Sequence, residues 1–413
     1  MGRLERVTEF FGLRRSIVGL LGMVILVGMG EKLAERFLPI YLLALIGWDF
    51  LPGLLNAMDN LLSALYSFPG GYLSDRLGTK RALLVFNLIA IGGFLIVILI
   101  PAWPAVFVGS FFFLSWTAIS LPATMDLVAK VLPKNKRTMG VSVHSLVRRI
   151  PMAVGPVLGG VLIDLFRAKY GERDGVILGV RVAFLVALGL AVVAAIFQQL
   201  LIEEDRPTEG GKEKPVAEKN PLRVLREMNP ALRTLLVSDV LIRFCEQIPY
   251  AYMAIWAMQA ARGAHIGATQ FGILTTIEMA TAILCYIPVA YLADRGQKKP
   301  FVVATFVFFT IFPLVLLVSR SFWMLAIAFV VRGLKEFGEP TRKALIMDLA
   351  PEGRKAAMFG AYYLVRDLIV SVGAAGGAFL WLIGPEANFL AACAFGAAGT
   401  LWFALRGRDL GKA

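Results

Sequence analysis

Charged side chains inside long apolar stretches are the residues of this sequence whose types and positions can do chemistry. An ionisable group at membrane depth costs about 2.5–3.5 kcal/mol on insertion scales, so it marks a functional site by default. A carboxylate in such a place can carry a proton, because desolvation favours its neutral form. The residues expected to bind and release protons are Glu35, Asp59, Glu246 and Glu278. Glu35 adjoins Arg36, whereas no lysine or arginine lies within four sequence positions of Glu278.

Basic side chains at similar depth can bind an anion. At 1.5 Å per helical residue, Arg148, Arg332 and Arg366 each lie roughly 15 Å from a membrane face. A guanidinium matches a carboxylate or phosphate with two parallel hydrogen bonds. The expected substrate-binding residues are Arg36, Arg148, Arg332, Arg366, Tyr41, Tyr250 and Tyr362. The alternative is static ion pairing within the protein, as the i,i+4 spacing of Lys335 and Glu339 permits.

Twelve apolar stretches must position these side chains. The chain has 413 residues, of which 58% are hydrophobic and 17% charged, against about 25% charged in soluble proteins. A span needs about 20 apolar residues, so a soluble globule, a disordered chain and a fibre are excluded. We predict an all-α polytopic membrane protein with 12 transmembrane helices, at 16–46, 51–73, 81–101, 104–131, 138–166, 178–202, 232–260, 268–292, 299–319, 321–349, 355–383 and 386–406.

A polar, charged segment over residues 202–229 separates two sets of six stretches. Most of the 42 basic residues fall in segments that would be cytoplasmic if both termini are inside, as the positive-inside rule requires. We therefore expect a multi-pass protein of the cell (inner) membrane with cytoplasmic N- and C-termini. The net charge of +13 belongs to these loops and does not indicate nucleic-acid binding.

The two sets of stretches are copies of each other. Residues 53–76 match 272–295 at an offset of 219, and residues 146–148 match 364–366 at an offset of 218. Matches at nearly one offset indicate two parallel repeats. We predict a six-helix bundle over 1–203, a cytoplasmic linker over 204–231 and a second six-helix bundle over 232–413.

The loop after the second stretch carries a recognisable motif. Residues 71–81 read GYLSDRLGTKR, which resembles the signature G-x-L-x-D-R-x-G-x-K-R of the major facilitator superfamily. A degraded copy lies at 290–299. The resemblance implies two pseudo-symmetric bundles that alternate access, with a gating motif that docks on the start of the eleventh span. The residues expected in this motif are Gly71, Asp75, Arg76, Gly78, Lys80 and Asp126.

Two weaker resemblances concern the type of transport. Residues 155–160, GPVLGG, are similar to the end of the antiporter motif of drug:proton exporters, G-P-x-x-G-G. Residues 31–37, EKLAERF, are similar to the E-x-x-E-R-F stretch of proton-coupled peptide transporters, with one residue more between the two glutamates. The second resemblance implies a proton-coupling role for Glu35 and a pairing or substrate role for Arg36.

The expected function is proton-coupled secondary active transport by alternating access, with export of an amphipathic or anionic small molecule. The alternative is proton-coupled uptake of an anionic solute such as a peptide or an organic acid. A membrane-embedded enzyme or receptor is a third class. We expect no enzymatic activity, no cofactor and no metal, because the sequence contains neither a phosphate-binding G-x-x-x-x-G-K-[ST] nor a His/Cys cluster. The expected partners are the small-molecule substrate, protons and the lipid bilayer, with no nucleic acid and a monomeric protein.

Overall fold

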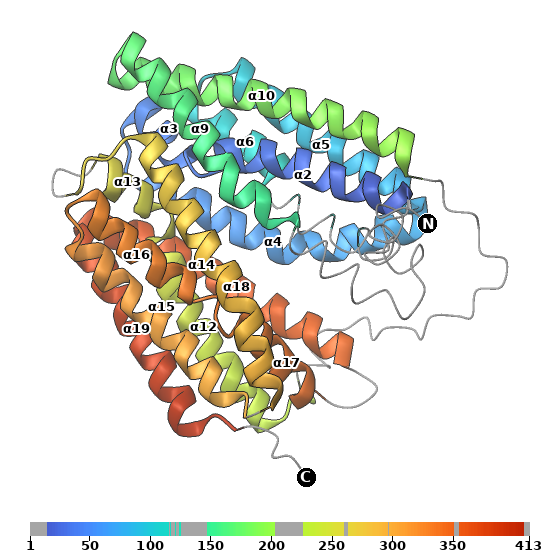
Figure 1. Cartoon of the computed structure of the whole chain (residues 1–413), viewed down its shortest axis with the longest axis vertical. Coiled ribbons are helices and arrows are strands. Elements are labelled where there is room, and N and C mark those ends of the chain that lie inside the picture. The colour runs from blue at the N-terminus through green and yellow to red at the C-terminus, as the bar shows by residue number, and fades with distance from the viewer. Residues whose placement is uncertain are drawn as a thin grey trace, which may run out of the picture. The chain divides into compact units, whose positions relative to one another are not determined.

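The computed structural model describes residues 15–114, 116, 120, 124, 147–202, 226–259, 263–295, 297–350 and 355–408. These residues contain fifteen helices and no strand (Figure 1). Seven of the described helices are long and apolar enough to cross a membrane, namely those over 79–99, 149–170, 172–201, 268–285, 299–318, 358–383 and 385–406. The count of twelve spans stays a prediction.

The described chain forms two compact units. The first unit comprises Met1–Gly47, Leu65–Pro207 and Gly267–Thr276. Its helices are α2 (Arg15–Glu35), α3 (Leu38–Ile46), the end of α4 (Phe50–Leu77), α5 (Thr79–Leu99), α6 (Trp103–Phe113), α9 (Arg149–Tyr170), α10 (Glu172–Leu201) and the start of α14 (Ala268–Arg295).

The second unit comprises Trp48–Ala64, Thr208–Ile266 and Ile277–Ala413. Besides the remainders of α4 and α14, its helices are α12 (Pro230–Tyr250), α13 (Tyr252–Met258), α15 (Lys299–Val318), α16 (Phe322–Leu334), α17 (Glu339–Leu349), α18 (Lys355–Ile383) and α19 (Pro385–Arg406). The predicted bundles 1–203 and 232–413 stay a prediction.

Small residues let the helices of the first unit pack closely. In this unit α10 packs against α2, α9 and α5 (Figure 1). A Cβ on Gly159 of α9 would overlap the backbone carbonyl of Leu33 in α2, and a Cβ on Gly30 would lie 3.0 Å from the carbonyl oxygen of Ala187 in α10. Backbones approach this closely only where no side chain separates them.

A carboxylate joins α9 to the start of α14 within the first unit. Asp164 accepts hydrogen bonds from the backbone N–H groups of Ala268 (3.0 Å) and Thr269 (2.8 Å). These N–H groups are among the first of α14, which have no partner within the helix. Asp164 therefore satisfies the N-terminus of α14, and Thr276 adds a hydrogen bond to the carbonyl of Ala153 at 2.6 Å.

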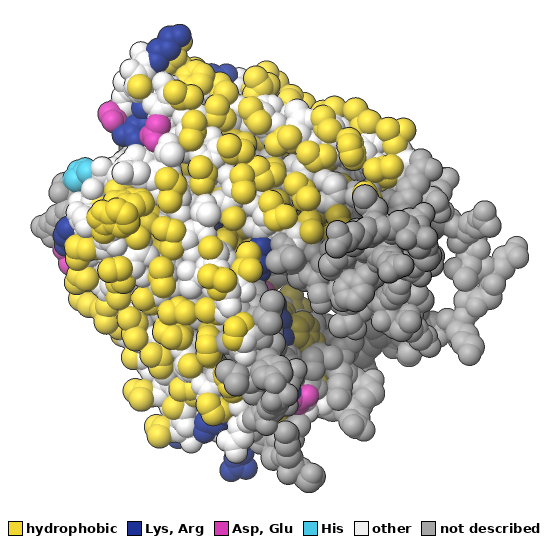
Figure 2. All heavy atoms as spheres, in the orientation of Figure 1, with side chains coloured by type: hydrophobic (Ala, Val, Ile, Leu, Met, Phe, Trp, Pro, Cys, Tyr) yellow, Lys and Arg dark blue, Asp and Glu magenta, His cyan; other side chains and the backbone are white. Residues whose placement is uncertain are grey.

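An apolar core and an apolar surface characterise the second unit. Phe306, Leu345, Tyr362 and Phe403 belong to its largest buried cluster. In the same unit α12 packs against α18 and α19, and α15 packs against α19. Hydrophobic side chains cover most of the described surface visible in Figure 2. An apolar exterior of this extent suits lipid contact.

Three helical breaks position the polar side chains. The first separates α2 from α3 before Pro39, the second separates α12 from α13 after Pro249, and the third separates α16 from α17 over 335–338. Carbonyls near the second break receive side-chain donors. Asn56 Nδ2 donates to the carbonyl of Gln247 at 2.9 Å, and Asn388 Nδ2 donates to that of Ile248 at 3.3 Å. Irregular backbone at membrane depth needs such internal partners, because lipid supplies none.

Replacement of Gly159 with alanine tests the close helix contact in the first unit. We expect Gly159→Ala to lower the free energy of unfolding by at least 1 kcal/mol, the range typical of overpacking. The matched control is Gly189→Ala in α10, where a Cβ meets no atom within 4 Å. Because alanine favours a helix over glycine by about 1 kcal/mol, the control should be neutral or stabilising. Thermal unfolding of both purified variants measures the difference, and equal stability would contradict the packing.

Candidate functional site

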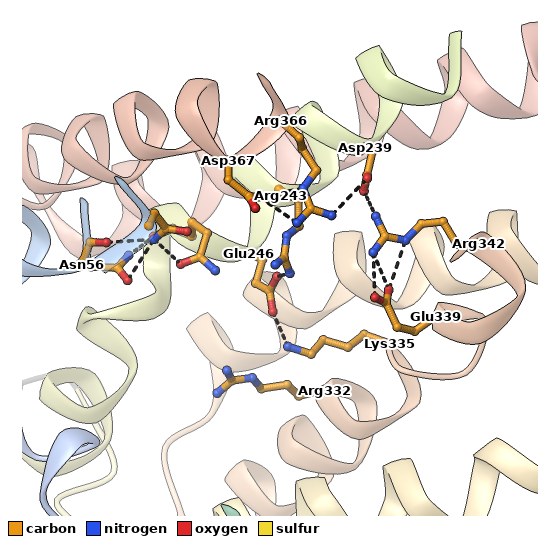
Figure 3. Close-up of polar contacts among 12 residues, drawn as sticks. Asn56, Asp239, Arg243, Glu246, Arg332, Lys335, Glu339, Arg342, Arg366 and Asp367 are labelled. Atoms are coloured by element: carbon orange, nitrogen blue, oxygen red, sulfur yellow. Dashed lines mark hydrogen bonds and ion pairs between the residues drawn. The ribbon is translucent and has the colours of Figure 1, made fainter. Parts of the chain in front are cut away.

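A network of buried charged side chains lies within the second unit (Figure 3). Helices α12, α14, α16, α17 and α18 and the break over 335–338 supply its members. Its buried and partly buried members are five acids and five bases, namely Asp239, Glu246, Glu278, Glu339 and Asp367 with Arg243, Arg332, Lys335, Arg342 and Arg366. At its edge the half-exposed Lys343 also pairs with Glu339 at 3.3 Å. Because a charge inside a membrane protein needs a counter-charge, this pairing permits the burial.

One branch of the network alternates in sign along its length. Arg332 Nε lies 3.1 Å from Glu278 Oε1, and Lys335 Nζ lies 3.8 Å from the same oxygen. Lys335 also forms an ion pair with Glu246, which in turn pairs with Arg243 one turn earlier in α12. The five side chains thus form a run of positive and negative charges that joins α14, α16 and α12.

Arg332 is enclosed by aromatic rings. Its guanidinium carbon lies 5.5 Å from the ring centroids of Tyr250 and Phe312 and 5.7 Å from that of Phe329. Cation–π attraction of this kind strengthens when the cation is desolvated, and the Arg332 side chain is only 2% exposed. The rings and Glu278 together hold one orientation of this guanidinium.

The other branch centres on Asp239 of α12. Its carboxylate forms an ion pair with Arg342, lies 3.4 Å from Arg366 Nη1 and accepts a hydrogen bond of 3.0 Å from the Tyr362 hydroxyl. Arg366 also pairs with Asp367 at 2.7 Å, and its guanidinium carbon lies 4.1 Å from the ring centroid of Tyr363. Arg342 pairs further with Glu339 at 2.6 Å.

A smaller charged group lies in the first unit. Lys32 of α2 forms ion pairs with Glu31, at 2.9 Å, and with Glu35. Arg148 attracts Glu31 electrostatically. The lysine between the two glutamates therefore neutralises one of them and leaves the other for Arg148.

The structure distributes the predicted site residues over both units. It brings Glu246, Glu278, Arg332, Arg366 and Tyr362 into the network of the second unit, with Tyr250 against Arg332. The remaining predicted residues lie outside this network: the first unit contains Glu35, Arg36, Arg148 and Tyr41, and the second contains Asp59 in α4. The hydroxyl of Tyr41 is buried without a hydrogen-bond partner among the described residues.

The predicted gating motif is described only in part. Gly71, Asp75 and Arg76 belong to α4, and Asp126 lies outside the described residues. Gly78 precedes α5 with φ of 81°, a backbone conformation that favours glycine. Lys80 Nζ donates a hydrogen bond of 2.8 Å to the carbonyl of Gln199.

Comparison with known proteins decides the family. The model of the Major Facilitator Superfamily matches residues 20–263 and 235–412. The chain belongs to this superfamily. The protein is therefore a secondary transporter and not an enzyme, with a small-molecule substrate and a multi-pass membrane fold. No curated protein matches the sequence.

Solved structures of other superfamily members share the fold. The peptide transporter POT in complex with alafosfalin is 16% identical, with a TM-score of 0.73 over 96% of this chain and 94% of that chain. The nucleoside transporter NupG is 10% identical, with a TM-score of 0.78 over 95% and 100% of the two chains. A bacterial homologue of the human lysosomal transporter Spinster is 14% identical, with a TM-score of 0.70 over 95% of each chain. At these identities the likeness shows an all-α polytopic fold alone.

Two important network residues of this superfamily member were not expected from sequence. Neither Asp239 nor Arg342 is among the site residues that the sequence predicts. The signal for Asp239 is its position four residues before Arg243 within an apolar stretch, which places both on one helix face. Nothing local indicates Arg342, because the break over 335–338 decides its direction. Among the described residues no group of three or more His, Cys, Asp and Glu could hold a metal ion.

Removal of the Asp239 charge tests the second branch. We expect Asp239→Asn to destabilise the protein by about 3 kcal/mol, because Arg342 and Arg366 lose their shared counter-charge in a buried place. The matched control is Asp348→Asn, whose carboxylate is exposed and whose pair with Lys298 should contribute at most about 1 kcal/mol. Thermal unfolding in detergent measures both variants. Equal losses would show that Asp239 is not the central counter-charge.

Proposed function

We propose that this superfamily member is a proton-coupled secondary transporter that works by alternating access and exports an amphipathic or anionic small molecule. The observation that carries the proposal is the largely buried network of five acids and five bases in the second unit. Protonation of any one acid leaves its cation without a full counter-charge. The affinity of the network for a charged substrate therefore depends on proton occupancy.

The residues take these roles in the proposal. Glu35, Asp59, Glu246 and Glu278 bind and release protons. Arg332 and Arg366 bind an anionic group, and Tyr250 and Tyr362 provide the adjacent aromatic surface. In the first unit Arg36 and Arg148 bind an anionic group of the substrate, and Tyr41 provides aromatic surface. Lys32 forms ion pairs with both Glu31 and Glu35. These pairs support a coupling role for Glu35, because protonation of Glu35 would break its ion pair with Lys32.

The predicted architecture belongs to the same proposal. The bundles 1–203 and 232–413 are the bodies whose movement alternates access, and 204–231 is the cytoplasmic linker. The motif of Gly71, Asp75, Arg76, Gly78, Lys80 and Asp126 stabilises one access state. The protein lies in the cell membrane with both termini cytoplasmic and acts as a monomer.

Proton-coupled uptake of an anionic solute is the second candidate, and the charge balance favours it for one class of substrate. A cation competes with protons for the same carboxylates, so cation and proton travel in opposite directions. An anion that binds to a neutral network is balanced only if a proton binds as well, so anion and proton travel together. With an inward proton gradient, the first case is export and the second is uptake.

Reconstitution in liposomes with an internal pH dye tests the proposal. A panel of monocarboxylates, dipeptides and amphipathic cations is applied under an imposed pH gradient. At least one class should show solute flux coupled to proton flux, in opposite directions for export and in the same direction for uptake. We expect Glu35→Gln and Glu278→Gln each to reduce this coupled flux at least tenfold, with Asp174→Asn at the exposed start of α10 as control. Coupled flux that survives both glutamine variants would show that neither glutamate couples transport to protons.

A further inference from the structure

Two buried atoms in one run of ion pairs, separated by two intervening side chains, have no hydrogen-bond partner among the described residues. Oε2 of Glu278 is an acceptor without a donor, and Nε of Arg243 is a donor without an acceptor. Lys335 and Glu246 connect them, because Glu278 pairs with Lys335, Lys335 with Glu246 and Glu246 with Arg243. An unsatisfied buried polar atom is costly, so each of the two positions suits a ligand that supplies the missing partner.

We propose that these two atoms mark two linked sites, a proton site at Oε2 of Glu278 and a site for the carboxylate or phosphate group of an anionic substrate at Nε of Arg243. This proposal rests on the second candidate of the proposed function, proton-coupled uptake of an anionic solute, and deepens it, because it names the residue that takes the proton and the residue that binds the anion. Glu246 then acts as the connection between the two sites.

The surroundings of Glu278 suit a proton that comes and goes. The charged groups that face it are Arg332 and Lys335, and both approach Oε1 alone. Oε2 is therefore free to form the O–H bond, with the proton supplied from water. The side chain is 2% exposed, so the neutral form avoids the desolvation of a charge. After protonation, Arg332 keeps its contacts with the rings of Tyr250, Phe312 and Phe329 and its hydrogen bond to Met253 Sδ at 3.1 Å.

Protonation of Glu278 changes the electrostatic environment of Arg243 through two intervening side chains, Lys335 and Glu246. A neutral Glu278 no longer attracts Lys335, so Lys335 pairs with Glu246 alone. The ion pair between Glu246 and Arg243 then weakens, so the Arg243 guanidinium loses part of its counter-charge. The other charges that act on Arg243 are Asp367, Arg342 and Glu339, and they do not change in this step. The result is a stronger attraction for an anion at Arg243 when a proton occupies Glu278.

The two sites therefore bind their ligands together. One proton and one monovalent anion leave the balanced network neutral, so the charge balance predicts one proton for each monoanion. Linkage also works in reverse, because an anion at Arg243 must raise the proton affinity of Glu278 by the same factor. Of the two directions considered above, joint binding corresponds to uptake.

Infrared difference spectroscopy of the full-length protein in liposomes tests the proton site. The carbonyl stretch of protonated carboxyl groups should appear as pH falls, and one component of this band should be lost in Glu278→Gln and persist in Glu246→Gln. The midpoint of this component is the pH at which half of it has appeared. Loss of one positive charge in Arg243→Gln should raise the midpoint by about one pH unit, whereas Arg243→Lys, which keeps the charge, should leave the midpoint unchanged. In a Lys335→Gln background the shift caused by Arg243→Gln should fall below a third of its value. A band that is unchanged in Glu278→Gln overturns the proton site, and an undiminished shift without Lys335 overturns the connection.

Thermal unfolding with acetate, against acetamide at equal ionic strength, tests the anion site. Acetate should raise the melting temperature more at pH 5.5 than at pH 8, and acetamide should have no such effect. In Glu278→Gln the acetate effect should be equal at both pH values, and in Arg243→Gln it should be lost. An acetate effect that is independent of pH in the wild type contradicts the linkage, and one that survives Arg243→Gln contradicts the anion site.

Failure of this proposal differs from failure of the proposed function. Proton-driven solute flux in liposomes without a titrating Glu278 would leave the transporter proposal standing and refute the linked sites. A titrating Glu278 without any flux driven by a pH gradient would refute proton-coupled transport.

Discussion

The requirement that a buried charge have a counter-charge governs this structure. In water an arginine or glutamate needs no partner, but within a membrane protein an isolated charge is too costly to persist. The second unit meets the requirement with ten side chains of balanced sign. No single member is independent of the others, because removal of one charge leaves its neighbour uncompensated. The same property makes the network responsive to a proton, which changes one charge and redistributes the rest.

Broken helices allow the charges to meet. A continuous helix through 335–338 would direct Lys335 and Arg342 by helical periodicity alone, whereas the break between α16 and α17 lets Lys335 reach Glu246 and Arg342 reach Asp239. A break exposes backbone groups, and the structure satisfies some of them with side chains: Thr305 Oγ1 accepts a hydrogen bond of 2.6 Å from the Gly338 N–H. The polar residues of the unit therefore stabilise one another and the irregular backbone that positions them.

Sequence reasoning anticipated the kinds of residue in the site better than their partners. Apolar periodicity and the 71–81 motif indicated the helical membrane class and the superfamily, and burial cost alone selected Glu246, Glu278 and Arg332. The partner of Glu278 was not predictable, because Arg332 lies 54 positions away on another helix and only the rotation of both helices brings them together. Asp239 was missed although it lies one turn before Arg243. Local spacing reports contacts within one helix, and the network is built mainly from contacts between helices.

A double-mutant cycle on Glu246 and Lys335 tests the central claim most directly. The free energy of unfolding is measured for the wild type, Glu246→Gln, Lys335→Met and the double variant in the same detergent. Each single change leaves a buried charge without its partner, whereas the double change removes both charges together. The account predicts that the double variant is more stable than additivity allows, by about 1–3 kcal/mol. Additive effects, within about 0.5 kcal/mol, would show that these charges do not depend on each other and would contradict the account.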